Sequence, residues 1–326
     1  MCFCFLQMTG LAGKGEGLMF RMNYRTAVIL GAVITICCCA FSGLSAAEEA
    51  FVENEWNYVD RSMDVSHGIP ENATGVLERI RRTGVLRVAT EPYFPPQEFI
   101  DPERDGQQQY AGADMELARL IAERMGVELQ IIPMEFSRVL PALTEDQADL
   151  TVSAISFTPS RAVLWTMSGG YYFADSPSST VLIVRADEKE QFAGPEMLKD
   201  KTLIAQGSSV QEALAAEHIP HYREFRRVPS IQAVYDAVAQ GRADAGAVDM
   251  ETAENYIRNN PESGLALAEN LHLDLEEQYL GDRIAAKKGE TQLIYFVNGV
   301  INEVLENGTY LKWIEEAQKR ADELGM

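Results

Sequence analysis

Asp149-Leu-Thr-Val-Ser-Ala-Ile-Ser-Phe-Thr-Pro-Ser-Arg161 is the stretch of sequence that decides the fold. Its apolar part predicts a buried strand over Leu150 to Ile155. Thr158 is a good helix cap and Pro159 suits a first helical turn, so we expect a helix to begin there. In open α/β sheets, ligands bind beyond the carboxyl ends of the strands. Arg161 is therefore placed to grip a carboxylate through its guanidinium group, although a surface salt bridge is the commoner role for an arginine.

The alternation of strands and helices extends on both sides of this stretch. The first set of predicted strands is Val85 to Ala89, Glu128 to Ile132 and Leu150 to Ile155, with helical periodicity between them. A second set follows Val181-Leu182-Ile183-Val184, with strands at Thr202 to Ala205 and Ala243 to Val248, and helices from Ser208, over Ser230 to Gln240 and from Glu251. Two successive α/β units with mostly parallel sheets and flanking helices are therefore expected. The tail adds Ile284-Ala285-Ala286 and two helices over Leu293 to Leu324, which we expect to pack on the first sheet.

The first 47 residues have the layout of a secretory signal peptide. Arg21 and Arg25 precede an apolar stretch from Ala27 to Leu44, and small residues follow at 45–47. The long segment before Arg21 favours translation from Met19 or Met22. A retained membrane anchor is an alternative, but the apolar run is near the lower length limit for spanning a bilayer. A lipid anchor on the cysteines at 37–39 is disfavoured because no small residue precedes them in the way that lipoprotein processing needs.

Composition limits the classes of partner. The chain of 326 residues carries 28 basic and 49 acidic residues; without the leader, which holds three basic residues and one acidic residue, 25 remain against 48, a net charge of −23. Such a surface repels nucleic acid. All five cysteines lie in the leader, so we expect neither disulfides nor thiolate metal sites in the mature protein. His218 and His221 are three residues apart, but surface positions are expected for both, and no metal or cofactor is predicted.

Short blocks spread over Gly84 to Ile314 resemble the polar amino-acid family of periplasmic solute-binding proteins that serve ABC transporters. The matching blocks are Leu86 to Glu91 with Pro95-Pro96, Gly112 to Ala118, Leu140 to Leu143, Thr158 to Arg161, Tyr171-Tyr172, Gln206 to Ser209, Ala243 to Asp249 and Asn307 to Tyr310. The resemblance implies a two-lobed periplasmic binding protein fold whose lobes close around a ligand. It also implies that the protein hands a free amino acid to an ABC permease outside the cytoplasm, after removal of the signal peptide, as a monomer.

The domain boundaries follow from this fold. We expect a signal peptide at 1–47, a linker or loosely docked arm at 48–75, a discontinuous first lobe at 76–182 and 283–326, and a second lobe at 183–282. The lobes would be joined by two strand crossings, near Thr180 to Val184 and Glu277 to Arg283.

The resemblance also assigns the ends of the amino acid to particular residues. Arg161 and the backbone N–H of Ser156 would hold the α-carboxylate, with Ser209 of the second lobe assisting. Asp249, directly after a strand of the second lobe, would bind the α-ammonium group, and it is also a candidate helix N-cap. Opposite charges on opposite lobes are what a zwitterion requires.

The side-chain pocket would be walled by Phe94 and Phe136, with Glu91 at its far end and Ser153 and Ala154 in its lining. Both aromatic residues would count as core residues without the resemblance. An acidic end between rings favours a polar or cationic ligand of the glutamine, arginine, lysine or histidine type. The chain departs from the family at Ala113, Gln97, Ala154 and Ser168-Gly169-Gly170, so no single relative fixes the ligand.

Two other functional classes stay open from the sequence. Cyclohexadienyl dehydratases resemble these binding proteins in fold, and Glu91 would be the candidate general acid of such an enzyme. Asp249, however, would repel a second carboxylate on the substrate. The other class is a sensory ligand-binding module that reports to a separate receptor.

Overall fold

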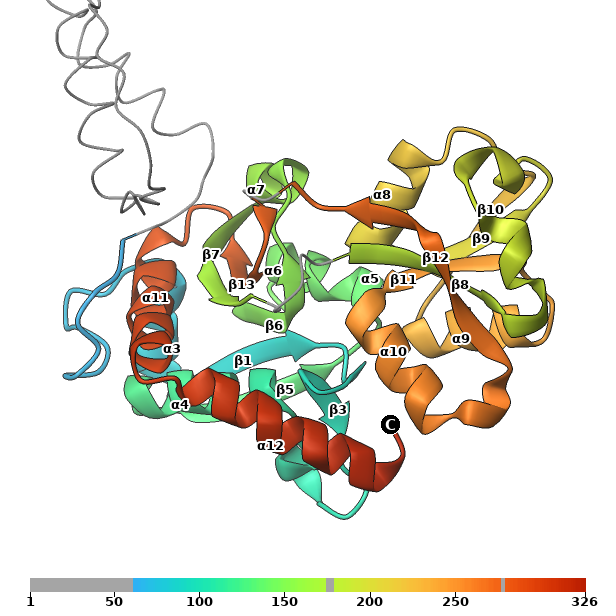
Figure 1. The fold of residues 1–326 in the computed structure, drawn as a ribbon. Coiled ribbons are helices and arrows are strands. Elements are labelled where there is room, and N and C mark those ends of the chain that lie inside the picture. Colours follow the sequence, from blue (N-terminus) through green and yellow to red (C-terminus); the bar gives the residue numbers. More distant parts are fainter. Residues whose placement is uncertain (1–60, 174–178, 277–278) are drawn as a thin grey trace, which may run out of the picture. The chain divides into compact units, whose positions relative to one another are not determined.

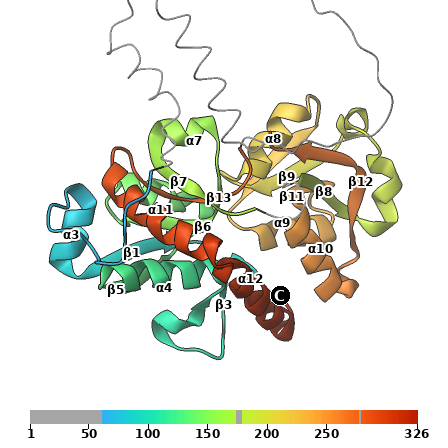
Figure 2. The ribbon, with the colours of Figure 1, turned by 60° about the vertical axis from the view of Figure 1, so that its left-hand side comes forward.

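Two five-stranded sheets organise the part of the chain that the computed structural model describes, residues 61–173, 179–276 and 279–326 (Figure 1). The predicted signal peptide, with its cysteines, lies outside these residues, as does the first half of the predicted arm. Each sheet belongs to its own α/β lobe (Figure 2). Within the described residues, no helix is both long and apolar enough to cross a membrane.

The first sheet has the strand order β5-β1-β6-β13-β7. Its strands are β1 (Val85–Thr90), β5 (Glu128–Pro133), β6 (Leu150–Ser156), β7 (Trp165–Tyr172) and β13 (Asp282–Lys287). β1 runs parallel to β5 and β6, whereas β13 is antiparallel to β6 and β7. Four strands therefore point one way, and β13, which arrives from the second lobe, opposes them.

The second sheet repeats this plan in the order β10-β9-β11-β8-β12. Its strands are β8 (Ser179–Arg185), β9 (Thr202–Gln206), β10 (Glu224–Val228), β11 (Ala245–Asp249) and β12 (Leu265–Asp274). β9 is parallel to β10 and β11, and β8 is antiparallel to β11 and β12. The opposing strand is again the one that enters from the other lobe.

The chain passes between the sheets twice. The first passage lies between the end of β7 and the start of β8, and the second lies between β12 and β13. The expected first crossing at Thr180 to Val184 is instead the body of β8, so the boundary expected after residue 182 falls inside a strand of the second sheet. The expected second crossing, at Glu277 to Arg283, covers the end of the connection and the start of β13.

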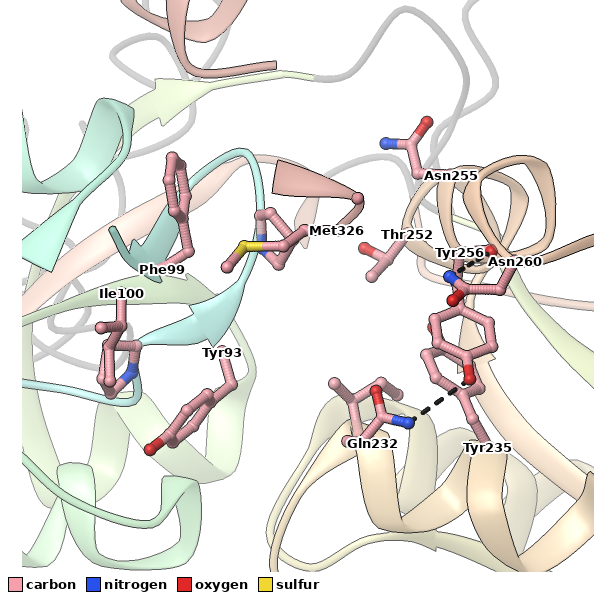
Figure 3. Close-up of a pocket in the computed structure, with 14 residues that line it drawn as sticks. Tyr93, Phe99, Ile100, Gln232, Tyr235, Thr252, Asn255, Tyr256, Asn260 and Met326 are labelled. Atoms are coloured by element: carbon pink, nitrogen blue, oxygen red, sulfur yellow. Dashed lines mark hydrogen bonds between the residues drawn. The ribbon is translucent and has the colours of Figure 1, made fainter. Parts of the chain in front are cut away.

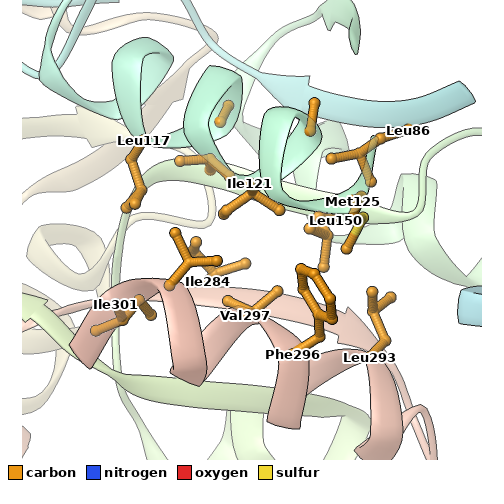
Figure 4. Packing of buried hydrophobic residues seen from close by; sticks show 14 of the residues in the cluster. Leu86, Leu117, Ile121, Met125, Leu150, Ile284, Leu293, Phe296, Val297 and Ile301 are labelled. Atoms are coloured by element: carbon orange, nitrogen blue, oxygen red, sulfur yellow. The ribbon is translucent and has the colours of Figure 1, made fainter. Parts of the chain in front are cut away.

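Helices cover both faces of the first sheet. One face carries α3 (Gly75–Thr83), α4 (Ala113–Met125), α11 (Thr291–Glu306) and α12 (Thr309–Leu324), and the other carries α5 (Phe136–Val139), α6 (Pro141–Thr144) and α7 (Pro159–Leu164). Figure 4 shows apolar side chains of α4 and α11 meeting Leu86, Leu150 and Ile284 of the sheet. The tail therefore packs on the first sheet, as expected.

The second sheet is covered in the same way. Val181 and Ile183 of β8 face α9 (Ile231–Ala239) and α10 (Met250–Asn259), whereas Leu182 and Val184 face α8 (Val210–His218). This alternation follows from the two-residue period of a strand, and it explains why β8 is apolar on both faces over residues 181–184. The remaining short helices are η1 (Gly106–Gln109), η2 (Ala186–Phe192), η3 (Pro195–Leu198) and η4 (Pro261–Ser263).

A small three-stranded sheet lies between β1 and α4 in sequence. It consists of β2 (Tyr93–Phe94), β3 (Glu98–Ile100) and β4 (Tyr110–Ala111). Gly112, which follows β4, has φ of +112°, and a Cβ there would overlap the carbonyl oxygen of Gln97. Glycine is therefore required where the chain turns into α4.

The described part of the arm is docked on the first lobe. Met63 N–H donates to the carbonyl oxygen of Tyr295 at 3.0 Å, and Asn298 Nδ2 donates to the carbonyl oxygen of Arg61 at 2.9 Å. Val65 is buried in the apolar core of the first lobe. A Cβ at Gly299 would collide with the Met63 carbonyl, so a glycine on α11 makes room for the arm.

Candidate functional site

The turn from β6 into α7 has the predicted form. Thr158 caps α7 by accepting a hydrogen bond from the Arg161 N–H at 3.2 Å, and Pro159 is the first residue of the helix. Arg161 is nearly buried, with 8% of its surface exposed. Its Nη1 donates to the Ser156 carbonyl at 2.7 Å, and its Nη2 donates to the Ser208 carbonyl at 2.9 Å. The guanidinium thus reaches from the first lobe to the second.

The Arg161 guanidinium is buried and has no counter-ion among the described residues. Desolvation lowers the pKa of its guanidinium to about 10, and the Asp282 carboxyl opposes this effect only in part. Arg161 forms no salt bridge with the described residues. Since a guanidinium has five N–H donors and two are engaged with carbonyl oxygens, the remaining N–H groups can donate to an anionic partner.

Asp249 is the opposite charge on the second lobe. It ends β11 and caps α10, where its Oδ1 accepts hydrogen bonds from Thr252 N–H at 2.9 Å and Thr252 Oγ1 at 3.0 Å. The predicted capping role is therefore confirmed. Burial raises the pKa of this carboxyl despite these hydrogen bonds. A cation placed beside Asp249 would remove that penalty.

Glu91 follows β1 and is also buried, with 2% exposed. Its Oε1 accepts a hydrogen bond of 2.7 Å from Gln206 Nε2, which comes from β9 of the other lobe. Desolvation raises the pKa of Glu91 to about 7, against the effect of the Gln206 hydrogen bond and with help from the Glu135 charge. Arg161–Ser208 and Glu91–Gln206 are thus two hydrogen bonds that join the lobes.

Ser153 has a supporting position beneath Glu91. Its Oγ accepts from the Glu91 N–H at 3.0 Å and donates to Glu98 Oε1 at 2.9 Å. Ala154 has a positive φ of 44°, and its N–H donates to Asp114 Oδ2 at 2.9 Å. Positive φ is uncommon for a residue other than glycine, so the Ala154 backbone is held in this conformation by its surroundings, the Asp114 hydrogen bond included.

Ser209 and the two aromatic residues complete the predicted set. Ser209 caps α8 by accepting from the Glu212 N–H at 3.0 Å, so its hydroxyl is already engaged. The Phe136 ring centroid lies 6.0 Å from the Arg161 guanidinium carbon. Phe94 ends β2 and is half-buried.

Two adjoining small cavities bring the predicted residues together. The first, of about 30 Å³, is lined by all of them except Asp249. The second, of about 50 Å³, is lined by Asp249 and shares Phe94, Ala154 and Ser156 with the first. A cavity of 30 Å³ holds about one water molecule, so an amino acid enters only if the Arg161–Ser208 and Glu91–Gln206 hydrogen bonds are replaced.

Several lining residues were not predicted as ligand contacts. Gln206 and Glu98 line the first cavity, and Asp282, Glu251 and Gln97 line the second. Gln206 stands in a block that resembles the family, which was the available signal. Asp282 reaches the site because β13 pairs antiparallel with β6, which sets it opposite Ser156. Burial raises its pKa well above the usual range, and the nearby Asp114, Asp249 and Glu251 charges add to this.

Glu98 and Asp114 form a buried carboxyl pair behind the first cavity. Asp114 accepts hydrogen bonds from the Ala154 N–H, Tyr171 OH and Tyr310 OH at 2.7 to 2.9 Å. Glu98 Oε2 has no hydrogen-bond partner among the described residues. Burial raises the pKa of both carboxyls, and the nearby Asp114 charge helps to raise that of Glu98 well above its usual range.

A larger cavity, of about 320 Å³, lies apart from these two (Figure 3). It is bordered by the β2–β3 hairpin, by α9 and α10 and by the last two residues, and Tyr93, Tyr235 and Tyr256 contribute rings to its wall. Its lining side chains, within the described residues, include no acidic or basic group. A zwitterion therefore fits the two smaller cavities better.

Comparisons with known proteins agree with this geometry. Residues 86–317 match the family of bacterial extracellular solute-binding proteins, family 3. The chain is 28% identical over 204 residues to the arginine-binding extracellular protein ArtP of Bacillus subtilis (strain 168), which covers 60% of this chain and 73% of that protein. A cyclohexadienyl dehydratase of Pseudomonas aeruginosa is 24% identical over 242 residues, 73% of this chain and 87% of that enzyme.

A crystal structure of similar fold has L-arginine bound. It is the amino acid ABC transporter substrate-binding protein AbpA from Streptococcus pneumoniae, with a TM-score of 0.66 and 30% sequence identity, covering 75% of this chain and 98% of that one. The family match spans most of the chain and both sheets, including every residue of the two small cavities. The chain therefore belongs to the bacterial extracellular solute-binding proteins of family 3.

Proposed function

We propose that this protein captures a free amino acid with a polar or cationic side chain, arginine foremost, and delivers it to an ABC permease. The observation that carries the proposal is a pair of opposite charges on opposite lobes, the buried Arg161 and the half-buried Asp249, neither of which has a salt-bridge partner among the described residues. An amino acid presents a carboxylate and an ammonium group a few ångströms apart. It would neutralise both residues at once, which no singly charged ligand does.

The far end of the pocket supports a cationic or amide side chain. Glu91, Phe94 and Phe136 line the same cavity as Arg161, and we place the ligand side chain between the two rings with its end at Glu91. A guanidinium or amide between aromatic rings gains stacking and cation–π energy and ends on the carboxyl oxygens. ArtP and AbpA, which are similar to this chain, support arginine as the first ligand to test.

Ligand binding is expected to couple to the arrangement of the lobes. Arg161 contacts the Ser208 carbonyl and Gln206 contacts Glu91, so residues of each lobe occupy the positions that ligand groups would take. An incoming α-carboxylate would replace the Ser208 carbonyl at Arg161, and a side-chain cation would compete with Gln206 for Glu91. Closure of the lobes around the ligand then depends on ligand contacts with both.

The cellular setting follows from the family and the leader. We infer that residues 1–47 direct export and are removed, that the mature protein acts as a monomer in the periplasm or another extracytoplasmic space, and that the closed form is recognised by the permease. The acidic surface, with a net charge of −21 for the whole chain, suits a soluble carrier that avoids anionic lipid.

Isothermal titration of the mature protein with the amino acids tests this proposal. We expect arginine, lysine, histidine or glutamine to bind, with a matching rise in the thermal midpoint because the ligand binds only the folded state. Tight binding of glutamate or leucine, with no binding of the four polar or cationic candidates, would show that the assignment of the far end is wrong.

The dehydratase relative defines a second candidate function. A carboxyl with a pKa near 7, such as that of Glu91, suits a general acid at neutral pH. The raised pKa of Asp249 weakens its repulsion of a second carboxylate, which the substrate of such an enzyme carries. Incubation with prephenate or arogenate decides the matter: formation of an aromatic product would make the protein an enzyme, and we expect none.

A further inference from the structure

Glu91 is a buried carboxyl without a cationic partner. The described residues that contact or face it are Gln206 of β9, Ser153 of β6, Glu98 of β3 and Glu135 before α5. Of these, Gln206 and Ser153 are neutral and the two glutamates are acidic. No salt bridge to Glu91 occurs within the described part of the chain.

The other charged groups of the same cavity are already engaged. Arg161 donates to the Ser156 and Ser208 carbonyls, and in the proposed function the α-carboxylate replaces the Ser208 carbonyl at this guanidinium. Burial raises the pKa of Glu98 well above its usual range, and the charges of Asp114 and of Asp282 in the neighbouring cavity add to this, so Glu98 retains its proton to higher pH than in water. Glu91 is therefore the group that meets the far end of the ligand.

Burying an ionised carboxylate without a counter-ion is costly, so such a carboxyl retains a proton to higher pH than it does in water. The pKa of about 7 for Glu91 agrees with its burial and with the acidic groups around it. At neutral pH, the ligand-free protein therefore exists in two forms of comparable population, one with Glu91 protonated and one with Glu91 ionised.

We propose that a cationic side chain binds only the form with ionised Glu91 and so expels a proton, whereas a neutral amide side chain also binds the protonated form. The proposal rests on the proposed function, since it concerns the far end of the same ligand. The balance is simple: the protonated protein and the cationic ligand give the complex and one proton, which passes to the solvent. The ligand guanidinium keeps its own proton throughout.

Selection by pH follows from this linkage. With a pKa of about 7, the ionised fraction of Glu91 rises about tenfold between pH 6 and pH 8. The affinity for arginine should rise by about the same factor over this range, while the affinity for glutamine stays nearly constant. One pocket would thus favour the cationic ligand above pH 7 and lose that preference below it.

Calorimetric titration in buffers of different ionisation enthalpy counts the protons directly. We expect arginine binding to release close to one proton at pH 6, about half a proton at pH 7 and almost none at pH 8.5. L-glutamine and L-citrulline, the latter a neutral analogue of arginine in shape, serve as matched ligands. Any proton linked to Asp249 and the α-ammonium group appears equally with all three and cancels in the difference.

Two variants sharpen the test. Glu91→Gln, which resembles the protonated form, should lose arginine binding at every pH from 6 to 8.5 and keep glutamine binding, with folding checked by circular dichroism. Glu123→Gln, on the exposed surface of α4, should leave both unchanged. If Glu91→Gln does not fold, the proton count of the unaltered protein from pH 6 to 8.5 still decides the question.

Binding of arginine with no proton release, and with constant affinity across this range, would overturn the inference and leave the proposed function intact. Failure of every amino acid to bind would overturn both. Release of equal numbers of protons with arginine and citrulline would assign the proton to another group and also contradict the inference.

Discussion

Arg161 shows how a single buried charge defines one end of a site. It lies at the end of a strand, keeps unused N–H donors and has a pKa lowered by desolvation. Arg161→Ala should weaken amino acid binding by about 2 to 5 kcal/mol, because a desolvated carboxylate is left without its partner. Titration calorimetry measures this loss. Arg138→Ala, at an exposed arginine in α5, is the control and should bind normally. If Arg161→Ala binds as tightly as the parent protein, the carboxylate assignment is wrong.

Asp249 combines a structural role with a proposed binding role, and one substitution separates them. Asparagine caps helices as well as aspartate does, so Asp249→Asn should lower the free energy of unfolding by no more than about 0.5 kcal/mol. The loss of charge should still weaken amino acid binding at least about tenfold, since the α-ammonium group loses its counter-ion. Denaturation and titration of the same variant measure the two effects.

The matched comparison is Ser230→Ala at the cap of α9. Ser230 accepts from the Ala233 N–H, and its loss should cost about 1 kcal/mol of stability with no effect on binding. Normal ligand binding by Asp249→Asn would leave Asp249 with only its capping role.

At the scale of the element, the turn into α4 depends on Gly112. Its φ of +112° and the approach of the Gln97 carbonyl leave no room for a side chain. Gly112→Ala should lower the free energy of unfolding by about 2 kcal/mol or more, through backbone strain and steric overlap together. Gly84→Ala is the control, because Gly84 also has positive φ but a methyl group on its Cα would meet no atom within 4 Å. It should cost only about 1 kcal/mol in chemical denaturation; equal losses at the two positions would show that strain alone decides.

The elements that the sequence predicts well are those with a local cause. β1, β5, β6 and β9 extend within one residue of the predicted ends, because each has a short pattern of apolar and β-branched residues that the local sequence shows. β10 was not predicted, since Glu224–Val228 is an edge strand whose charged side chains remain largely exposed. β7 was missed as well, because Ser168, Gly169 and Gly170 interrupt its pattern, and its place in the sheet comes from pairing with β13.

The site residues also divide into those that the local sequence predicts and those that depend on contacts between distant parts of the chain. The carboxyl-end position of Arg161 and the cap at Asp249 are visible in short motifs. Glu98 and Asp114 are not, because their roles depend on Ser153, Ala154, Tyr171 and Tyr310, which are 40 to 196 positions away in the chain. Gln206 meets Glu91 across 115 positions and between lobes. Such contacts arise only when the two sheets are assembled.

At the scale of the whole molecule, the buried carboxyl groups of the site lower the stability of the folded protein when they ionise. The pKa values of Glu91, Glu98, Asp249 and Asp282 are all raised by burial, so each favours the folded protein less once it ionises. A cationic ligand would offset part of this cost. As pH rises, the stability of the ligand-free protein should therefore fall, whereas its affinity for arginine should rise.

Glu91→Gln tests this cost through the pH dependence of unfolding. The ordinary pKa of 4.5 and the folded value of about 7 mean that the folded protein holds a proton the unfolded chain has lost across this window. Stability should therefore fall as pH rises from about 4.5 to above 7, by about 3 kcal/mol in total for this group. Glutamine resembles the protonated carboxyl, so the variant should match the parent near pH 4.5 and exceed its free energy of unfolding by up to about 3 kcal/mol at pH 8. Urea denaturation at several pH values, with Glu123→Gln as the control, measures the difference; parallel pH profiles for Glu91→Gln and the parent would show that Glu91 is ionised at no cost to the folded state.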